Sequence, residues 1–464
     1  MEKTREKNAW LRLAAKEGKD IDRIADGYVR FLNEVRTERQ AVDYITSVAK
    51  SAKFVPLSAV KKLKAGDRVI WQEHGKISAL CIIGKQPIEE GINLVASHAD
   101  APRVDLKPVP LYEDAGMALF KTHYYGGIKK YQWTAIPLAL HGVVIKKDGT
   151  KVEIRIGDAP EDPVFTITDL LPHLAKDQME KKMGEGVTGE GLNILVGSLP
   201  QPKGKKEEPG QQRIKAAIEE LLKNKYGIEP EDFLSAELQG VPAIPAREIG
   251  FDRSLIGGFG QDDRVCVYTS LAAALEVKAP EKTAVCLFAD KEEIGSVGNT
   301  GLESFVLEHL ISDLLEKAGK TDFALVRRAL RYAKALSADV NGAVDPNYEG
   351  VFEKMNSAFV GQGVCVTKYT GSRGKSGASE ANAEFVAQIR RLFDDNDVPW
   401  QAGELGKVDQ GGGGTVSMFL ARYGMEVLDC GVALLGMHSP FEVTAKSDIY
   451  ATYKAYKVFM QSFA

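Results

Sequence analysis

Short apolar runs, each followed by polar or glycine-rich residues, most constrain how this 464-residue chain can fold. Four such runs are residues 77–83, 92–96, 283–288 and 427–435. Runs of this length, rich in aliphatic and β-branched side chains, are typical of strands buried in a sheet. Apolar residues at helical spacing lie between and after them, as in residues 446–463. Strands that alternate with helices predict an α/β fold.

The middle of the chain has a different character. Residues 106–152 contain many aromatic residues, glycine pairs and short alternating runs, which favours β-structure, and residues 147–150 (Lys-Asp-Gly-Thr) suit a hairpin turn. Residues 201–210 are polar and rich in proline and glycine, which predicts an exposed loop. We therefore predict one α/β domain built from residues 1–103 and 250–464, with a β-rich insertion at residues 104–249.

Composition and charge exclude several classes of protein. The 60 basic and 64 acidic residues give a net charge of −4, which provides no electrostatic footprint for nucleic acid. No stretch approaches the roughly 20 apolar residues of a membrane span, and the N-terminal residues lack the apolar core of a signal peptide. The five cysteines are widely spaced among apolar residues, which favours reduced thiols. We expect a cytoplasmic protein that binds neither nucleic acid nor a membrane.

Two adjacent carboxylates follow one of the predicted strands. Glu292 and Glu293 come just after the run 283–288, where the chain enters a loop with Gly295 and Gly298. Adjacent side chains on an extended or turning backbone point in different directions, so one could bind a metal ion while the other faces a reacting water. The alternative interpretation is a pair of solvated surface acids, because most charged residues are exposed.

Four further polar sites follow predicted strands or occupy glycine-rich turns. They are His98 with Asp100, Asp262 with Asp263, Asp339, and His438. Ligands bind at the carboxyl edge of open α/β sheets, and imidazoles with carboxylates suit zinc, with cobalt or manganese as alternatives. Each site also has a local interpretation, namely a hydrogen-bonded histidine, a helix cap or a closed turn. Their recurrence at strand ends favours a site for two metal ions.

Four strings of residues carry a more specific resemblance. They read Ser-His-Ala-Asp at 97–100, Asp-Lys-Glu-Glu-Ile-Gly-Ser at 290–296, Ser-Ala-Asp at 337–339 with Asp-Pro-Asn-Tyr at 345–348, and Met-His-Ser at 437–439. In order and over nearly the whole chain they resemble the aspartyl aminopeptidase family, which includes vacuolar aminopeptidase I. The resemblance implies a dinuclear metallo-aminopeptidase that removes N-terminal residues from peptides, on a mixed-sheet α/β fold of the zinc-exopeptidase type. It also implies that the insertion is a dimerisation domain and that homodimers assemble into a hollow tetrahedral homododecamer.

The same resemblance implies a metal-ligand set. One ion would be held by His98 and Asp339, the other by Glu293 and His438, with Asp262 as the bridge or Asp263 in its place. Two divalent cations would compensate the mutual repulsion of crowded carboxylates and lower the pKa of a bridging water.

The resemblance also implies roles beyond metal binding. Glu292 would be the general base that takes a proton from the water, and Asp100 would orient the ring of His98. His173 resembles a family histidine that reaches the active site of a neighbouring subunit. Arg373, with Lys375 nearby, lies where the family places a basic residue for an acidic substrate side chain; solvated surface cations are the alternative.

Two segments depart from the eukaryotic pattern of the family. Residues 340–345 contain none of the histidines that aspartyl aminopeptidases usually have there, and residues 411–414 are four consecutive glycines, as in bacterial members. The glycines would let the backbone approach a substrate or form a flexible loop. We therefore make no prediction of which N-terminal residue, acidic or other, the enzyme prefers. The alternative functions are a metal-dependent deacylase or carboxypeptidase on a related fold, and a catalytically silent shell protein.

Overall fold

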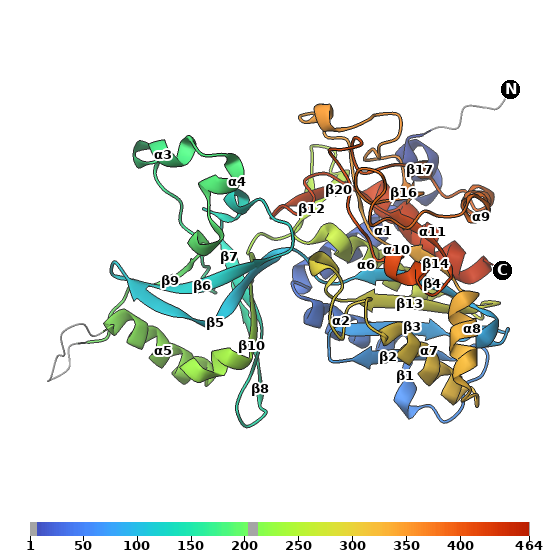
Figure 1. Cartoon of the computed structure of the whole chain (residues 1–464), viewed down its shortest axis with the longest axis horizontal. Coiled ribbons are helices and arrows are strands. Elements are labelled where there is room, and N and C mark those ends of the chain that lie inside the picture. The colour runs from blue at the N-terminus through green and yellow to red at the C-terminus, as the bar shows by residue number, and fades with distance from the viewer. Residues whose placement is uncertain (1–6, 203–211, 464) are drawn as a thin grey trace. The chain divides into compact units, whose positions relative to one another are not determined.

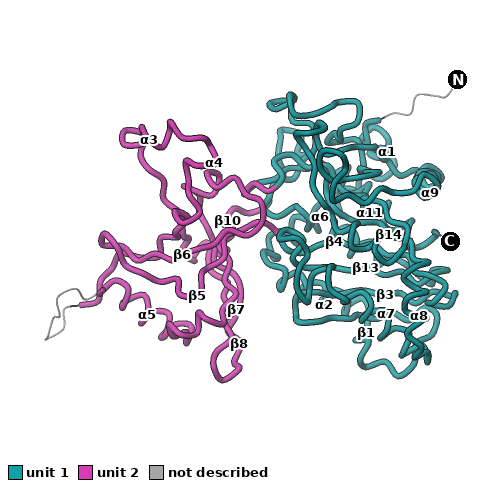
Figure 2. Tube along the Cα trace, viewed as in Figure 1, with its two compact units in different colours: residues 1–100, 246–437, 441–464 teal, residues 101–245, 438–440 magenta. Residues whose placement is uncertain are grey.

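The computed structural model describes residues 7–202 and 212–463 (Figure 1). Most of the predicted loop at 201–210 and the first six residues, on which the signal-peptide argument depended, lie outside the described residues. The chain forms two compact units (Figure 2). Unit 1 comprises Met1–Asp100, Ala246–Met437 and Phe441–Ala464, and unit 2 comprises Ala101–Pro245 and His438–Pro440. No helix in the described part of the chain is long and apolar enough to cross a membrane.

Unit 1 is built on a nine-stranded sheet with the order β1-β2-β3-β13-β4-β14-β18-β16-β17. The strands are β1 (Val55–Pro56), β2 (Arg68–Glu73), β3 (Ile77–Ile82), β4 (Ile92–His98), β13 (Thr283–Ala289), β14 (Lys334–Ser337), β16 (Val364–Thr367), β17 (Trp400–Ala402) and β18 (Glu426–Gly431). The central strands β13, β4, β14 and β18 run parallel to one another, whereas β3 is antiparallel to β13 and β16 to β18. The predicted α/β fold with a mixed sheet is therefore confirmed.

Helices cover both faces of this sheet. They are α1 (Ala9–Glu34), α2 (Glu38–Ser51), α6 (Gln261–Glu276), α7 (Val306–Lys317), α8 (Phe323–Arg331), α9 (Ala383–Asp395), α10 (Ser417–Ala421) and α11 (Lys446–Ser462). Successive side chains of a strand point to opposite faces. In β4, accordingly, Val95 packs in the core beneath α1, α6 and α11, and Leu94 and Ala96 pack in the core beneath α7 and α8. Every residue of β4 is buried, as expected for a central parallel strand.

Smaller elements complete unit 1. Two short sheets contain β11 (Arg247–Ile249), β12 (Leu255–Gly258) and β20 (Glu442–Ala445), and β15 (Asn341–Gly342) with β19 (Ala433–Leu434). Single 3₁₀ turns are η1 (Leu57–Ala59), η2 (Ile88–Glu90), η7 (Glu292–Ile294) and η8 (Glu349–Val351).

Two sequence-based boundaries differ from the structure. Residues 22–52 have apolar side chains at helical spacing throughout, which predicts a single helix. The structure has two helices there, because the chain is extended at Val35 and at Thr37, whose side chain caps α2 by accepting a hydrogen bond from the Gln40 N–H. The apolar run 427–435 likewise divides into β18 and β19. At the division, Gly431 lies so close to the backbone of Asp339 that no side chain would fit without a shift.

Unit 2 contains a six-stranded antiparallel sheet with the order β8-β7-β10-β5-β6-β9. Its strands are β5 (Arg103–Asp114), β6 (Met117–Tyr125), β7 (Leu138–Ile145), β8 (Lys151–Ile156), β9 (Ile194–Gly197) and β10 (Ala236–Pro242). Its helices are α3 (Lys176–Met179), α4 (Met183–Gly186) and α5 (Arg213–Tyr226), with 3₁₀ turns η3 (Lys130–Trp133), η4 (Pro172–Leu174), η5 (Gly189–Gly191) and η6 (Pro230–Ser235). The Lys-Asp-Gly-Thr segment forms the turn between β7 and β8, with Gly149 at φ +87°.

Candidate metal centre

Three neighbouring parallel strands deliver polar residues to one edge of the unit 1 sheet. His98 is the last residue of β4, and its register partner in β13 is Ala289. Glu292 and Glu293 begin the turn that follows β13, and Asp339 lies two residues beyond the end of β14. Because the strands are parallel and in register, their carboxyl ends meet at the same edge, which brings these side chains together.

The ring of His98 is buried and surrounded by acidic groups. Its Nε2 atom lies 3.3 Å from Asp262 Oδ1, 3.8 Å from Glu292 Oε2 and 3.9 Å from Asp339 Oδ1. Burial opposes protonation of the ring, but hydrogen bonds with Asp100 and Asp262 and the charge of Glu292 together raise the pKa of His98 well above its usual value. The environment of Nε2 is thus one that attracts a cation.

Asp100 supports both the histidine and the turn after β13. Its Oδ1 and its backbone carbonyl oxygen lie 3.3 and 3.2 Å from His98 Nδ1. The same carboxylate accepts hydrogen bonds from the backbone N–H groups of Glu292 and Glu293, both at 3.2 Å. A partner on Nδ1 leaves Nε2 as the ligating nitrogen, which is the arrangement found around metal-bound histidines.

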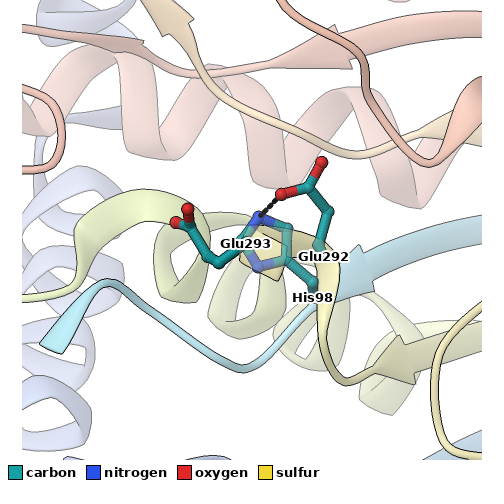
Figure 3. Close-up of side chains that lie close together, drawn as sticks. All are labelled: His98, Glu292 and Glu293. Carbon is teal, nitrogen blue, oxygen red and sulfur yellow. Dashed lines mark ion pairs between the residues drawn. The ribbon is translucent and has the colours of Figure 1, made fainter. Parts of the chain in front are cut away.

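The carboxyl groups of Glu292 and Glu293 diverge around the His98 ring (Figure 3). Glu292 reaches toward His98 Nε2, whereas Glu293 lies on the other side, with its Oε1 atom shielded from solvent. The two adjacent carboxylates therefore point to different parts of the site, and neither side chain is fully exposed to solvent.

Asp262 and Asp263 enter the site from an irregular start of α6. Gly260 is left-handed (φ +70°), and Asp262 and Asp263 have non-helical backbone angles, with a cis peptide bond between them. Asp263 accepts a hydrogen bond from the His98 N–H at 3.2 Å, while Asp262 faces His98 Nε2. The side chain of Asp262 therefore points into the site, and the local interpretation as a helix cap does not describe it.

The residues present fit a metal centre. His98, Asp262 and Asp339 each offer one ligand atom within 4.8 Å of the others, and so do His98, Glu292 and Glu293. Burial, together with the charge of Glu292 for Asp339 and of Asp262 for Asp263, raises the pKa of both Asp339 and Asp263 well above the usual value. Cations would relieve this repulsion, and a mixed imidazole and carboxylate set is one that zinc prefers.

Three further predicted residues belong to other segments of the chain. His438 belongs to the short segment grouped with unit 2, where its Nδ1 atom lies 2.8 Å from the carbonyl oxygen of Gly127. His173 is exposed in η4 of unit 2. Arg373 is exposed in a unit 1 loop closed by backbone hydrogen bonds between Ser372 and Ser376, and no ion pair joins it to another described residue.

Glu442 is a further residue next to the site, one that was not predicted from the sequence. This carboxylate is buried and accepts hydrogen bonds from the N–H groups of Gln261 and Asp262. The available signal was an acidic residue four positions after His438 and four positions before the start of the last helix. Local sequence does not distinguish such a residue from a solvated acid.

Comparison with known proteins identifies the family. Residues 31–460 match the family model described as aminopeptidase I zinc metalloprotease (M18). A probable M18 family aminopeptidase 1 from Clostridium acetobutylicum is 47% identical over 98% of both chains. The crystal structure of an M18 family aminopeptidase from Thermotoga maritima has a TM-score of 0.93 at 44% identity, covering 99% of this chain and 100% of that one. The S. cerevisiae mApe1 dodecamer shares the fold, with a TM-score of 0.75 at 20% identity over 94% and 96% of the chains. The chain therefore belongs to the M18 family of zinc metalloproteases and is an aminopeptidase.

Proposed function

We propose that this aminopeptidase hydrolyses peptides at a centre for two divalent ions, zinc by family. The proposed ligands are His98 and Asp339 for one ion, Glu293 and His438 for the other, and Asp262 as the bridge. The observation that carries the proposal is the approach of Asp262 and Asp339 to Nε2 of a histidine whose Nδ1 is already held by Asp100. His438 has the matching arrangement, because the Gly127 carbonyl occupies its Nδ1 side.

The metal ions would supply an activated water and polarise the scissile carbonyl. Glu292 then acts as the general base: its carboxylate takes a proton from the attacking water and returns it to the leaving amine. Two features suit Glu292 to this role. Its side chain is 18% exposed, so water and substrate can reach it, and its backbone N–H is fixed by Asp100. Asp100 also holds His98 in the tautomer that leaves Nε2 available.

The variant Glu292→Gln tests the assignment of the base. It keeps the shape of the side chain but cannot accept a proton, so kcat should fall about 10²- to 10⁴-fold while the zinc content per subunit stays unchanged. Glu303→Gln is the matched control, since Glu303 is an exposed acid eleven residues further along the chain, 3.4 Å from Arg422. A Glu292→Gln enzyme that lost its zinc would instead make Glu292 a ligand, in line with the alternative group of His98, Glu292 and Glu293.

We further propose that His173 and Arg373 contact the substrate, His173 from a neighbouring subunit. Both side chains are exposed and available for such contacts. A panel of aminoacyl-anilides, tested on enzyme stripped of metal and reloaded with zinc, cobalt or manganese, gives the preferred residue and metal. Replacing either residue by alanine should raise KM for the preferred substrate. Unchanged KM values across the panel would contradict the proposal that His173 and Arg373 contact the substrate.

For the assembly, we propose homodimers formed through the β-rich insertion and a tetrahedral homododecamer built from them. A run of exposed apolar side chains in unit 2 supports an interface there: Leu170, Leu171, Leu174, Met179 and Met183. The dodecameric S. cerevisiae relative of the same fold also supports it. Sedimentation analysis of the wild type and of a Leu174→Asp variant tests this. The proposed compartment is the cytoplasm, which five buried free thiols support.

A further inference from the structure

Glu442 is a buried carboxylate that the mechanism above does not use. It is the first residue of β20, pairs with Gly258 of β12, and is 1% exposed. Its Oε2 atom accepts hydrogen bonds from the N–H of Gln261 at 2.5 Å and from the N–H of Asp262 at 3.2 Å. Removing a carboxylate from water is costly unless strong hydrogen bonds compensate it, so this placement calls for an explanation.

The two N–H groups that Glu442 binds belong to the first turn of α6. The first N–H groups of a helix have no partner within the helix, and a side chain at the preceding residue usually satisfies one of them. Here that residue is Gly260, which has no side chain. Glu442 therefore takes the place of the cap from a strand 180 residues further along the chain, and its charge also suits the positive end of the helix dipole.

The side chain of Gln261 also connects the start of α6 to β20. It is fully buried, and its Nε2 donates to the backbone carbonyls of Glu442 at 2.6 Å and Ile256 at 3.2 Å. Its Oε1 accepts a hydrogen bond from the Tyr28 hydroxyl at 3.2 Å. Both amide hydrogens and the oxygen of Gln261 are thus engaged, so the residue before Asp262 is held from β12, β20 and α1.

We propose that Glu442 is a positioning residue for the metal centre: it fixes the turn from Gly260 to Asp263 and so directs the Asp262 carboxylate toward His98. The turn needs such support because Asp262 and Asp263 lie outside helical geometry, where the regular hydrogen bonds of α6 do not hold them. The inference rests on the proposed role of Asp262 as a metal ligand. A misplacement of about 1 Å at a ligand is enough to impair a site of this kind.

Zinc affinity, measured by competition with a chromophoric chelator, tests the proposal without relying on turnover. Glu442→Ala should weaken zinc binding about 10- to 100-fold, the usual effect of losing a residue that supports a ligand. Glu442→Gln should recover much of this affinity, because its amide oxygen can still accept both N–H bonds. In the metal-free protein, hydrogen exchange at the amides of Gln261 and Asp262 should be faster in Glu442→Ala than in the wild type.

Asp448→Ala provides a matched control. Asp448 is also a buried carboxylate that accepts two backbone N–H bonds, from Gly361 at 2.6 Å and Gly363 at 2.8 Å, but it is not part of the metal centre. Asp448→Ala should lower the melting temperature and leave zinc affinity unchanged. The proposal is overturned if Glu442→Ala binds zinc as the wild type does, or if Asp448→Ala loses as much zinc affinity at an equal loss of melting temperature.

Two further variants keep the outcome interpretable. If Glu442→Ala does not fold, Tyr28→Phe removes only the hydroxyl that holds Gln261 and should still weaken zinc binding measurably; wild-type affinity there would then count against the proposal. Asp262→Asn distinguishes an error in the ligand assignment from an error in the role of Glu442. If it binds zinc normally, the ligand assignment itself is wrong, whereas normal zinc binding in the Glu442 variants alone leaves Asp262 as a ligand and removes only the role of Glu442.

Discussion

Replacing Gly431 by alanine should displace a proposed metal ligand without touching the metal centre directly. Gly431 is the last residue of β18, and a Cβ there would lie 1.9 Å from the carbonyl oxygen of Asp339, 2.5 Å from its carbonyl carbon and 3.1 Å from the nitrogen of Val340. Contacts under 3.0 Å do not persist, so the Asp339 backbone must move by about 1 Å. The new Cβ is fixed to the backbone of residue 431 and the atoms that it meets are backbone atoms, so no side-chain rotation can relieve the clash.

The expected cost follows from that shift. A displacement of about 1 Å at a reacting centre can reduce the rate about 100-fold, equivalent to about 2.7 kcal/mol of transition-state stabilisation. Forcing an extra methyl group into a packed region also lowers stability by about 1–3 kcal/mol. We therefore expect kcat/KM for an aminoacyl-anilide to fall about 100-fold in Gly431→Ala, together with weaker zinc retention and a modestly lower melting temperature.

Gly350→Ala is the control for this experiment. No atom lies within 4 Å of a Cβ at Gly350, and its backbone is not left-handed, so the added methyl group should change neither kcat/KM nor zinc content. If Gly431→Ala retained the wild-type kcat/KM and zinc content, either the backbone of Asp339 would tolerate the shift or Asp339 would not be a ligand, and the reasoning would fail.

Three other expectations follow. Burial raises the pKa of Asp448 to about 7, although hydrogen bonds from the Gly361 and Gly363 amides oppose the increase. In the folded protein the Asp448 carboxyl group therefore keeps a proton that it releases near pH 4 in the unfolded chain. The free energy of unfolding should fall by up to about 1.4 kcal/mol per pH unit from pH 4 to 7. Urea-unfolding measurements that gave the same pH dependence for the wild type and Asp448→Asn would contradict this. Stripping the metal should lower the melting temperature at neutral pH, and free zinc at 100 times its Kd should stabilise the fold by about 2.7 kcal/mol; an unchanged melting curve would argue against a bound ion. Gly18→Ala, in α1 with open space around its Cβ, should stabilise by about 0.5–1 kcal/mol in chemical denaturation, and destabilisation would reveal a contact on that helix face.

Much of the candidate metal centre could be predicted from the sequence because it depends on local signals. A short apolar run predicts a strand, and the polar residue after it predicts where the strand ends. Applied to β4, β13 and β14, this rule places His98, Glu293 and Asp339 at one edge, and the structure brings them together there. The rule needs only that the three strands be parallel, which α/β patterning favours.

What could not be predicted depends on residues far apart in the sequence. The irregular start of α6 is held by Glu442, and nothing near residue 262 reveals an acceptor 180 positions away. The division of the 427–435 run likewise depends on contact between Gly431 and Asp339. The break between α1 and α2 was readable in principle, because Thr37 followed by Gln40 is a helix-capping pattern, but the continuous apolar spacing concealed it.

The position of β4 has a consequence for how the protein is made. β4 is complete at residue 98, but its two neighbours are β13 at residues 283–289 and β14 at residues 334–337. At synthesis rates of about 5–20 residues per second, the ribosome needs about 10–50 s to deliver both. Throughout that interval an apolar strand has two unpaired edges, the condition under which nascent chains aggregate. Unit 1 can therefore assemble only late in translation, and we expect its yield to depend on chaperones that shield the first hundred residues.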